Sequence, residues 1–167
     1  MKLIIKKQLF LQSILIAIFA TILDLYSKNM VFFYLFNHQD YQYLQYPKAE
    51  IVSFFNLVYV SNSGISFGMF DKASNAREIF ALLQGGIAFG LIFWLWNSQK
   101  KHISYALALI IGGAFGNVID RILNGGVTDF LDFHIGIYHW PAFNLADSLI
   151  FIGVLILVYD EFLLKKK

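Results

Sequence analysis

The chain has 167 residues, of which 58% are hydrophobic and only 14% are charged, and it contains no cysteine. Soluble domains carry about 25% charged residues, and with a formal net charge of only +2 this chain has too few ionic groups to cover a soluble surface. The composition therefore excludes an ordinary soluble domain, a disordered chain and a disulfide scaffold, and it indicates a small integral membrane protein.

Four apolar stretches are the predicted membrane-spanning helices. Lipid cannot satisfy a bare backbone, and each stretch with its flanks reaches the roughly 20 residues that cross a bilayer core. We expect the helices at about 8–28, 77–97, 103–123 and 144–164 within one membrane domain over 1–167. The first stretch also resembles a signal peptide, but it continues through further residues at helical spacing without an Ala-x-Ala site, which favours a retained helix.

The lysines predict the orientation in the membrane. With four spans, one side of the bilayer receives Lys2, Lys6, Lys7, Lys100, Lys101, Lys165, Lys166 and Lys167. The positive-inside rule then places both termini in the cytoplasm. The segments at about 37–76 and 124–143 face the periplasm, and the first of them is rich in β-branched and aromatic residues. That pattern predicts short strands with a turn, either as an ordinary hairpin or as a cover over a site.

Polar residues gather at the expected outer ends of the first and third helices. Asp24 and Lys28 are four residues apart, the spacing of a helical ion pair, which is either structural or part of a site. In the third stretch, Gly112 and Gly116 predict the close approach of another helix. In the second stretch, Gln84 and the adjacent Gly85–Gly86 pair are interpreted as packing features.

The third helix also carries a polar face at its outer end. Asn117 and Arg121 share this face, and Asp120 lies beside it. The alternative for Arg121 is snorkelling to the membrane interface. Because three polar residues stand so close to the glycines, we favour a polar site.

Further acids and amides follow near the start of the fourth helix. Asp129 lies in a short extended piece, and Asn144 is a candidate N-cap. Asp147 is in the first turn, where an acid by itself would complement the helix N-terminus. His134 and His139 are five residues apart, a poor spacing for metal ligands, and are interpreted as interfacial residues.

Carboxylate chemistry is the chemistry that these residues can support. The chain has no cysteine, no His-Glu-x-x-His and no Gly-x-Ser-x-Gly motif, so thiol, zincin and hydrolase-elbow mechanisms lack their parts. Two close aspartates cannot both ionise, so one keeps a proton while the other takes a proton from water. The candidates are Asp120, Asp129, Asp132 and Asp147, and the residue pattern does not choose the pair.

At these residues the chain resembles lipoprotein signal peptidase (signal peptidase II), a family of bacterial inner-membrane aspartyl endopeptidases. GGAFGNVIDR at 112–121, VTDF at 127–130 and PAFNLADS at 141–148 are similar to the C-terminal motifs of that family, in the same order. The resemblance implies that Asp129 and Asp147 are the catalytic pair, with no cofactor and no metal.

The resemblance implies further site residues and a substrate. The supporting or substrate-binding positions are Asp24, Lys28, Asn62, Gly64, Asn117, Asp120, Arg121 and Asn144. We expect Asn62 to hold substrate backbone, Arg121 to position substrate, and Asp120 to have a structural or electrostatic role. The implied substrate is a prolipoprotein that carries a diacylglyceryl group on a cysteine, with cleavage just before that cysteine. We expect a monomer in contact with membrane lipid.

Other functions are weighed against this one. A small transporter or proton-conducting bundle would use the same intramembrane groups, but it would place them through the whole membrane depth rather than at one side. A non-catalytic assembly factor would tolerate asparagine at positions 129 and 147. Nucleic acid is not an expected partner, because the basic residues are spread over loops and chain ends.

Overall fold

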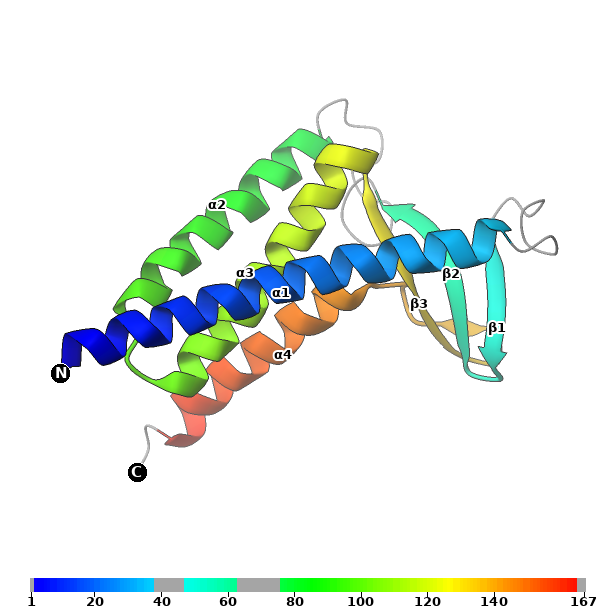
Figure 1. Ribbon diagram of the computed structural model, residues 1–167. Helices are drawn as coiled ribbons and strands as arrows, with labels where there is room; N and C mark the ends of the chain where they lie inside the picture. The colour runs from blue at the N-terminus through cyan, green and yellow to red at the C-terminus, as the bar shows by residue number, and fades with distance from the viewer. Residues whose placement is uncertain (1, 38–46, 63–75, 165–167) are drawn as a thin grey trace.

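The computed structural model of the protein describes residues 2–37, 47–62 and 76–164. In chain order the elements are α1 (Lys2–Asn37), β1 (Lys48–Val52), β2 (Phe55–Asn62), α2 (Ala76–Asn97), α3 (Lys101–Asn124), β3 (Val127–Ile135), β4 (Tyr138–His139) and α4 (Leu145–Tyr159), which continues as a π-helix over Asp160–Leu164. The chain is thus mostly helical with a small antiparallel sheet, as the sequence predicts (Figure 1).

Three helices in the described part of the chain are long and apolar enough to cross a bilayer, namely Lys6–Asn37, Glu78–Asn97 and Lys101–Asn124. The α-helical part of α4 has only 15 residues before the π-helical turn. Helix α1 extends further at both ends than the expected 8–28. No proline or glycine interrupts it, and its 36 residues give a length of about 54 Å.

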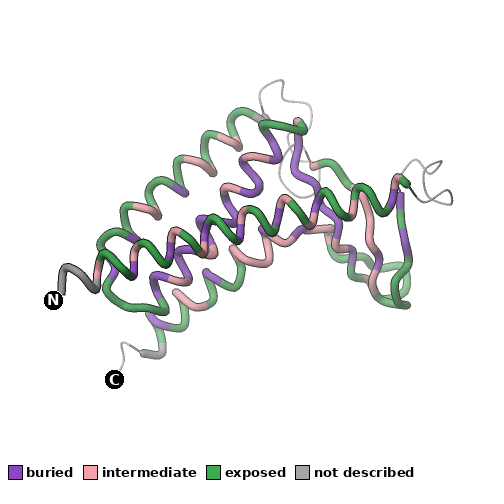
Figure 2. The backbone as a smooth tube through the Cα atoms, viewed as in Figure 1, coloured by how far each residue is buried: buried purple, intermediate pink, exposed green. Residues whose placement is uncertain are grey.

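Helix α3 lies among the other helices and is the most buried of them (Figure 2). A Cβ atom on Gly112 would lie 2.6 Å from the backbone oxygen of Ala17 in α1, and one on Gly113 would lie 2.5 Å from that of Ala146 in α4. Both helices therefore approach α3 at distances that only glycine permits. The predicted close approach at Gly112 is confirmed.

The glycine pair of α2 behaves differently. Among the described residues, a Cβ atom on Gly85 or Gly86 would meet no heavy atom of another segment within 4 Å. The interpretation of these glycines as packing features is therefore wrong. Sequence spacing identifies the glycines of a helix, but it does not tell which of them face a neighbour and which, like this pair, line an open groove.

The sheet joins two segments that are distant in the sequence. Strand order is β1-β2-β3-β4, with all neighbours antiparallel. Strands β1 and β2 form the predicted pair, connected by a turn at Ser53–Phe54. Strand β2 then pairs with β3, where Val60 stands opposite Asp129 and Asn62 opposite Val127. The segment expected as a loop at 124–143 therefore contains a nine-residue strand.

The long end of α1 supports the sheet. Phe32 and Phe36 of α1 both contact the ring of Tyr59 in β2, with ring centroids 5.5 Å and 5.3 Å apart. Aromatic pairs at these distances add to the free energy gained by burial. This contact explains why α1 continues beyond the expected span.

The two ends of the bundle differ. The beginning of α1, the α2–α3 connection and the end of α4 lie at one end, and the sheet lies at the other (Figure 1). At the end without the sheet, Asp160 accepts hydrogen bonds from Lys100 at 2.9 Å and lies 2.7 Å from Nε2 of His102. These contacts hold the end of α4 to the α2–α3 connection. The start of α4 is consequently directed toward the sheet.

Candidate active site

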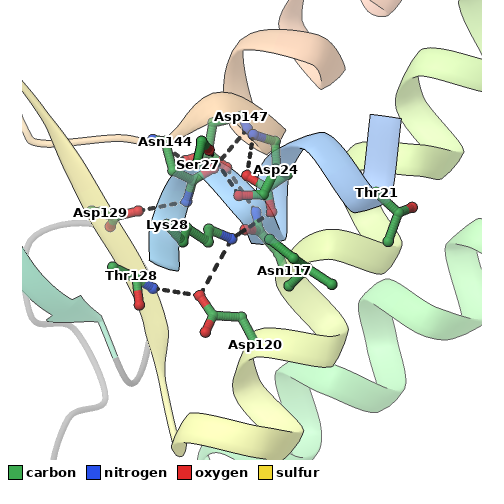
Figure 3. Close-up of polar contacts among 12 residues, drawn as sticks. Thr21, Asp24, Ser27, Lys28, Asn117, Asp120, Thr128, Asp129, Asn144 and Asp147 are labelled. Carbon is green, nitrogen blue, oxygen red and sulfur yellow. Dashed lines mark hydrogen bonds and ion pairs between the residues drawn. The ribbon is translucent and has the colours of Figure 1, made fainter. Parts of the chain in front are cut away.

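Asp129 of β3 and Asp147 of α4 meet through a single residue, Asn144 (Figure 3). The side-chain amide of Asn144 donates to Oδ1 of Asp129 at 2.7 Å. Its side-chain oxygen accepts from the backbone N–H of Asp147 at 3.0 Å, and Oδ2 of Asp147 accepts from the backbone N–H of Asn144 at 3.3 Å. This reciprocal pair is a capping box at the start of α4, which confirms Asn144 as the N-cap.

Asp129 is the more buried of the two acids. Its side chain is 4% exposed, and its second oxygen accepts a hydrogen bond from Nδ2 of Asn62 at 3.0 Å. Burial raises the pKa of Asp129 to about 6, although the hydrogen bonds from Asn62 and Asn144 act in the opposite direction. The nearby charge of Asp147 adds to the increase. Asp129 is therefore the acid of this pair that is suited to hold a proton.

This raised pKa predicts a pH-dependent difference between wild type and Asp129→Asn. The ordinary pKa of 3.8 describes the unfolded chain and about 6 the folded one, so the folded state binds the proton more tightly between these values. The stabilisation is complete below pH 3.8 and is lost as the pH rises through 6. From pH 4 to 7.5, wild type should lose about 2.5 kcal/mol of unfolding free energy relative to the variant. Denaturant unfolding in detergent at several pH values measures the unfolding free energies of wild type and Asp129→Asn.

Asp132 offers a matched control for that measurement. Burial raises its pKa, but hydrogen bonds from Asn56 at 2.6 Å and His139 at 2.7 Å outweigh this effect, and the net pKa is lowered. Its stabilisation is therefore present at neutral pH and lost on acidification. Asp132→Asn should change the pH dependence in the opposite direction. Equal pH dependence in wild type and Asp129→Asn would contradict the prediction.

Asp147 is held by a chain of polar groups that reaches α1. Nδ2 of Asn117 donates to Oδ1 of Asp147 at 2.9 Å, and the oxygen of the same amide accepts from Lys28 at 2.8 Å. Lys28 is only 4% exposed and lies 2.7 Å from Oδ2 of Asp24 and 3.3 Å from Oδ2 of Asp120. The predicted pair of Asp24 and Lys28 is confirmed. Because Lys28 donates to one end of the Asn117 amide, the other end is directed to Asp147.

The carboxylates beside Lys28 also fix the surrounding backbone. Asp24 accepts from the backbone N–H of Ala146 at 2.9 Å, within the first turn of α4. Asp120 accepts from the backbone N–H of Thr128 at 2.7 Å and from Nδ2 of Asn124 at 2.7 Å. These bonds connect α1 to α4 and the end of α3 to β3. The acids thus position the segments that carry Asp129 and Asp147.

Arg121 of α3 contacts α2 through its guanidinium. Its Nη1 donates to Oε1 of Gln84 at 2.7 Å. The sequence interpretation missed this role of Gln84, although a polar residue in the middle of an apolar helix is a signal of this kind. It also missed Asn56, which bonds Asp132. Gly64 lies outside the described residues.

The histidines lie on the β3–β4 hairpin. The rings of His134 and His139 stack with centroids 4.7 Å apart, and Nδ1 of His139 contacts Oδ1 of Asp132. Asp132 is therefore engaged within the sheet by Asn56 and His139, whereas Asn144 bonds Asp129.

The family model for "Signal peptidase (SPase) II" matches residues 16–163. This chain belongs to the signal peptidase II family. Similar proteins include the lipoprotein signal peptidases of Burkholderia vietnamiensis, 51% identical over 113 residues, and of a Janthinobacterium species, 50% identical over 117 residues. Each alignment covers 66% of this chain and 68% of the relative.

Two solved structures of bacterial membrane enzymes have a similar fold. A bacterial membrane enzyme determined by the in meso method at 1.9 Å matches with a TM-score of 0.73 and 28% identity, over 91% of this chain and 93% of that one. A second, at 2.3 Å, matches with a TM-score of 0.70 and 30% identity, over 90% of each chain. As a signal peptidase II, the protein is an aspartic peptidase with several apolar helices of a membrane protein.

Proposed function

We propose that this protein removes the signal peptide from diacylglyceryl-modified prolipoproteins by cutting just before the lipid-bearing cysteine. The relatives to which it is similar are named lipoprotein signal peptidases, a name that supports a lipoprotein substrate. The observation that carries the proposal is that Asn144 bonds two aspartates, one with a raised pKa, in a chain of this family. Family membership does not favour a transporter.

Asp129 and Asp147 are the proposed catalytic residues. Asp147 in its ionised form takes a proton from a water molecule, and the water oxygen attacks the scissile carbonyl carbon. Asp129 gives its proton to the carbonyl oxygen, which becomes the hydroxyl of a tetrahedral intermediate. Collapse of the intermediate re-forms the carbonyl and breaks the C–N bond: one hydroxyl returns its proton to Asp129, and the amide nitrogen receives the proton that Asp147 took. The products are a carboxylate on the signal peptide and an amine on the cysteine.

The hydrogen-bonding side chains have proposed roles in this scheme. Asn62 and Asn144 hold the two oxygens of Asp129, so the carboxyl group keeps one orientation while its proton moves. Asn117 does the same for Asp147. Fixed donors of this kind need no reorganisation during the reaction. Every step uses groups of the chain and water.

The proposed membrane arrangement has four spans, both termini in the cytoplasm, and the site at the periplasmic face of the inner membrane. The lysines at 100 and 101 lie at the end opposite the sheet, in agreement with the positive-inside rule. Tyr138 and Trp140 beside the sheet are 79% and 70% exposed, as is typical of residues at a membrane interface. The site draws on α1, α3, α4 and the sheet of one chain, which supports a monomer surrounded by lipid.

A cleavage assay with purified full-length protein tests the function. A prolipoprotein with a diacylglyceryl-cysteine is incubated with the protein in detergent, and the same prolipoprotein without lipid is the control. We expect mass spectrometry to find a new N-terminal cysteine only in the lipidated substrate. Intact lipidated substrate after prolonged incubation would contradict the proposal, and so would equal cleavage of both forms.

A further inference from the structure

A cavity of about 440 Å³ lies among the end of α2, the α2–α3 connection, the start of α3 and the end of α4. These segments form the end of the bundle opposite the sheet (Figure 1). Sites for small molecules have volumes of about 300–1,000 Å³, so the cavity is large enough for a ligand. The length of α4 separates it from the candidate site, because Asp147 is in the first turn of that helix and Asp160 follows its last.

The lining of this cavity changes from charged to apolar along the bundle. Its charged residues are Lys100, Asp160 and Glu161. Ile103 follows Lys100 by three residues, so it lies about 4.5 Å deeper in the bundle. Leu157 stands in the same relation to Asp160 in α4. The cavity therefore fits an amphiphile whose ionic head lies at the end of the bundle and whose apolar tail follows the helices inward.

Groups of both charges are accessible at the ionic end of the cavity. Nζ of Lys100 donates to the two oxygens of Asp160 at 2.9 Å, and the lysine side chain is 51% exposed. Because an ammonium carries three N–H donors, Lys100 can donate to one further acceptor. Asp160 is nearly inaccessible, whereas the adjacent Glu161 is exposed. A ligand at this end therefore meets an accessible cation and an accessible anion, which together complement a zwitterion.

Two further features indicate a lipid site at this end. The residues that follow α4, Asp160–Leu164, form a π-helix, and π-helical turns are rare and frequently lie at functional sites. Trp94 lines the cavity and is 47% exposed, and the nearby Trp96 is 50% exposed. Tryptophan is enriched at the level of the lipid headgroups. The charged end of the cavity thus lies at the depth where a phospholipid presents its headgroup.

We propose that the cavity binds one phospholipid whose zwitterionic headgroup ends in a primary ammonium, as in phosphatidylethanolamine. A phosphate oxygen of the headgroup accepts a hydrogen bond from Nζ of Lys100, and the ammonium donates to the carboxylate of Glu161. One acyl chain lies along Ile103 and Leu157. The bound lipid connects the α2–α3 connection to the end of α4, as the contact between Lys100 and Asp160 also does. This site is independent of the proposed peptidase activity, because the proposed catalytic pair lies at the sheet end of the bundle.

Native mass spectrometry of the full-length protein in detergent tests the lipid site. The probes are the dioleoyl forms of phosphatidylethanolamine, phosphatidylcholine and phosphatidylglycerol, together with glycerophosphoethanolamine, which has the headgroup without acyl chains. We expect one phosphatidylethanolamine per chain, bound about tenfold more tightly than the other two lipids, because these lack either the N–H donors or the ammonium. Glycerophosphoethanolamine should bind weakly, since it leaves the apolar part of the cavity empty. Equal affinity for the three lipids, or glycerophosphoethanolamine that binds as tightly as phosphatidylethanolamine, would overturn the inference.

Val158→Trp and Val154→Trp form a matched pair of variants for this test. Both valines are in α4 and are similarly exposed, at 45% and 42%, but Val154 does not line the cavity. Val158→Trp fills part of the cavity and should weaken phosphatidylethanolamine binding about tenfold or more, whereas Val154→Trp should bind like wild type. Glu161→Gln should bring the affinity for phosphatidylethanolamine close to that for phosphatidylcholine. Wild-type affinity in Val158→Trp, or an unchanged headgroup preference in Glu161→Gln, would contradict the assignment.

Discussion

Replacing either Asp129 or Asp147 with asparagine is expected to abolish prolipoprotein cleavage while the protein remains folded. Each replacement removes a group that exchanges a proton with water or substrate, and such groups contribute about 10²–10⁴-fold to the rate. The fall in cleavage rate after losing either aspartate should be larger than this factor, because the proposed scheme needs both carboxyl groups. Single-turnover cleavage of a diacylated prolipoprotein by purified variants measures the effect.

Asp132→Asn is the matched control for this experiment. Asp132 lies on the same strand as Asp129 and is similarly buried, at 6% against 4% exposed, but its partners are Asn56 and His139. We expect this variant to retain activity. Unfolding curves of all variants in detergent establish that the proteins are folded. Full activity in Asp129→Asn or Asp147→Asn would refute the assignment of the pair.

Of the variants described here, Lys28→Met should lower the unfolding free energy the most. Lys28 lies between Asp24 and Asp120, and all three side chains are nearly inaccessible to solvent. Removing one partner of a buried ion pair leaves an uncompensated charge, which costs about 3–5 kcal/mol. Asn117 also loses the contact that directs its amide toward Asp147, so cleavage should slow in the fraction that remains folded. Denaturant unfolding in detergent measures the loss of unfolding free energy.

Two further variants make the Lys28 result specific. Lys101→Met removes an exposed lysine at the opposite end of the bundle and should leave the unfolding free energy nearly unchanged. In the double variant Asp24→Asn with Lys28→Met, one of the two stranded charges is gone, so part of the stability should return. If Lys28→Met unfolds like wild type, the network does not have the energetic role described above.

Local sequence patterns predicted several elements of this structure correctly. Apolar length identified the helices because a spanning helix must satisfy its own backbone in lipid. Helical spacing gave the pair of Asp24 and Lys28, and the preference for asparagine at helix starts gave the cap at Asn144. These features depend on residues that are close in the chain.

Other features depend on contacts between distant segments, which one sequence does not encode locally. The pairing of β2 with β3 brings Asn62 to Asp129 across 67 positions, and no periodicity within either strand specifies that partner or its register. The same limit applied to Gln84 and Arg121, 37 positions apart. Among four candidate aspartates, only the folded chain shows which two share Asn144. Their catalytic role stays a prediction.

The position of Asn144 makes the proposed site depend on the folded start of α4. Asn144 caps α4 through its side-chain oxygen and donates to Asp129 through its side-chain amide nitrogen, so one residue both starts the helix and connects the two acids of the proposed site. If the beginning of α4 frays, the two acids separate at the same moment. A newly inserted or damaged copy would therefore be latent, and proteolytic competence would arise only together with the finished fold.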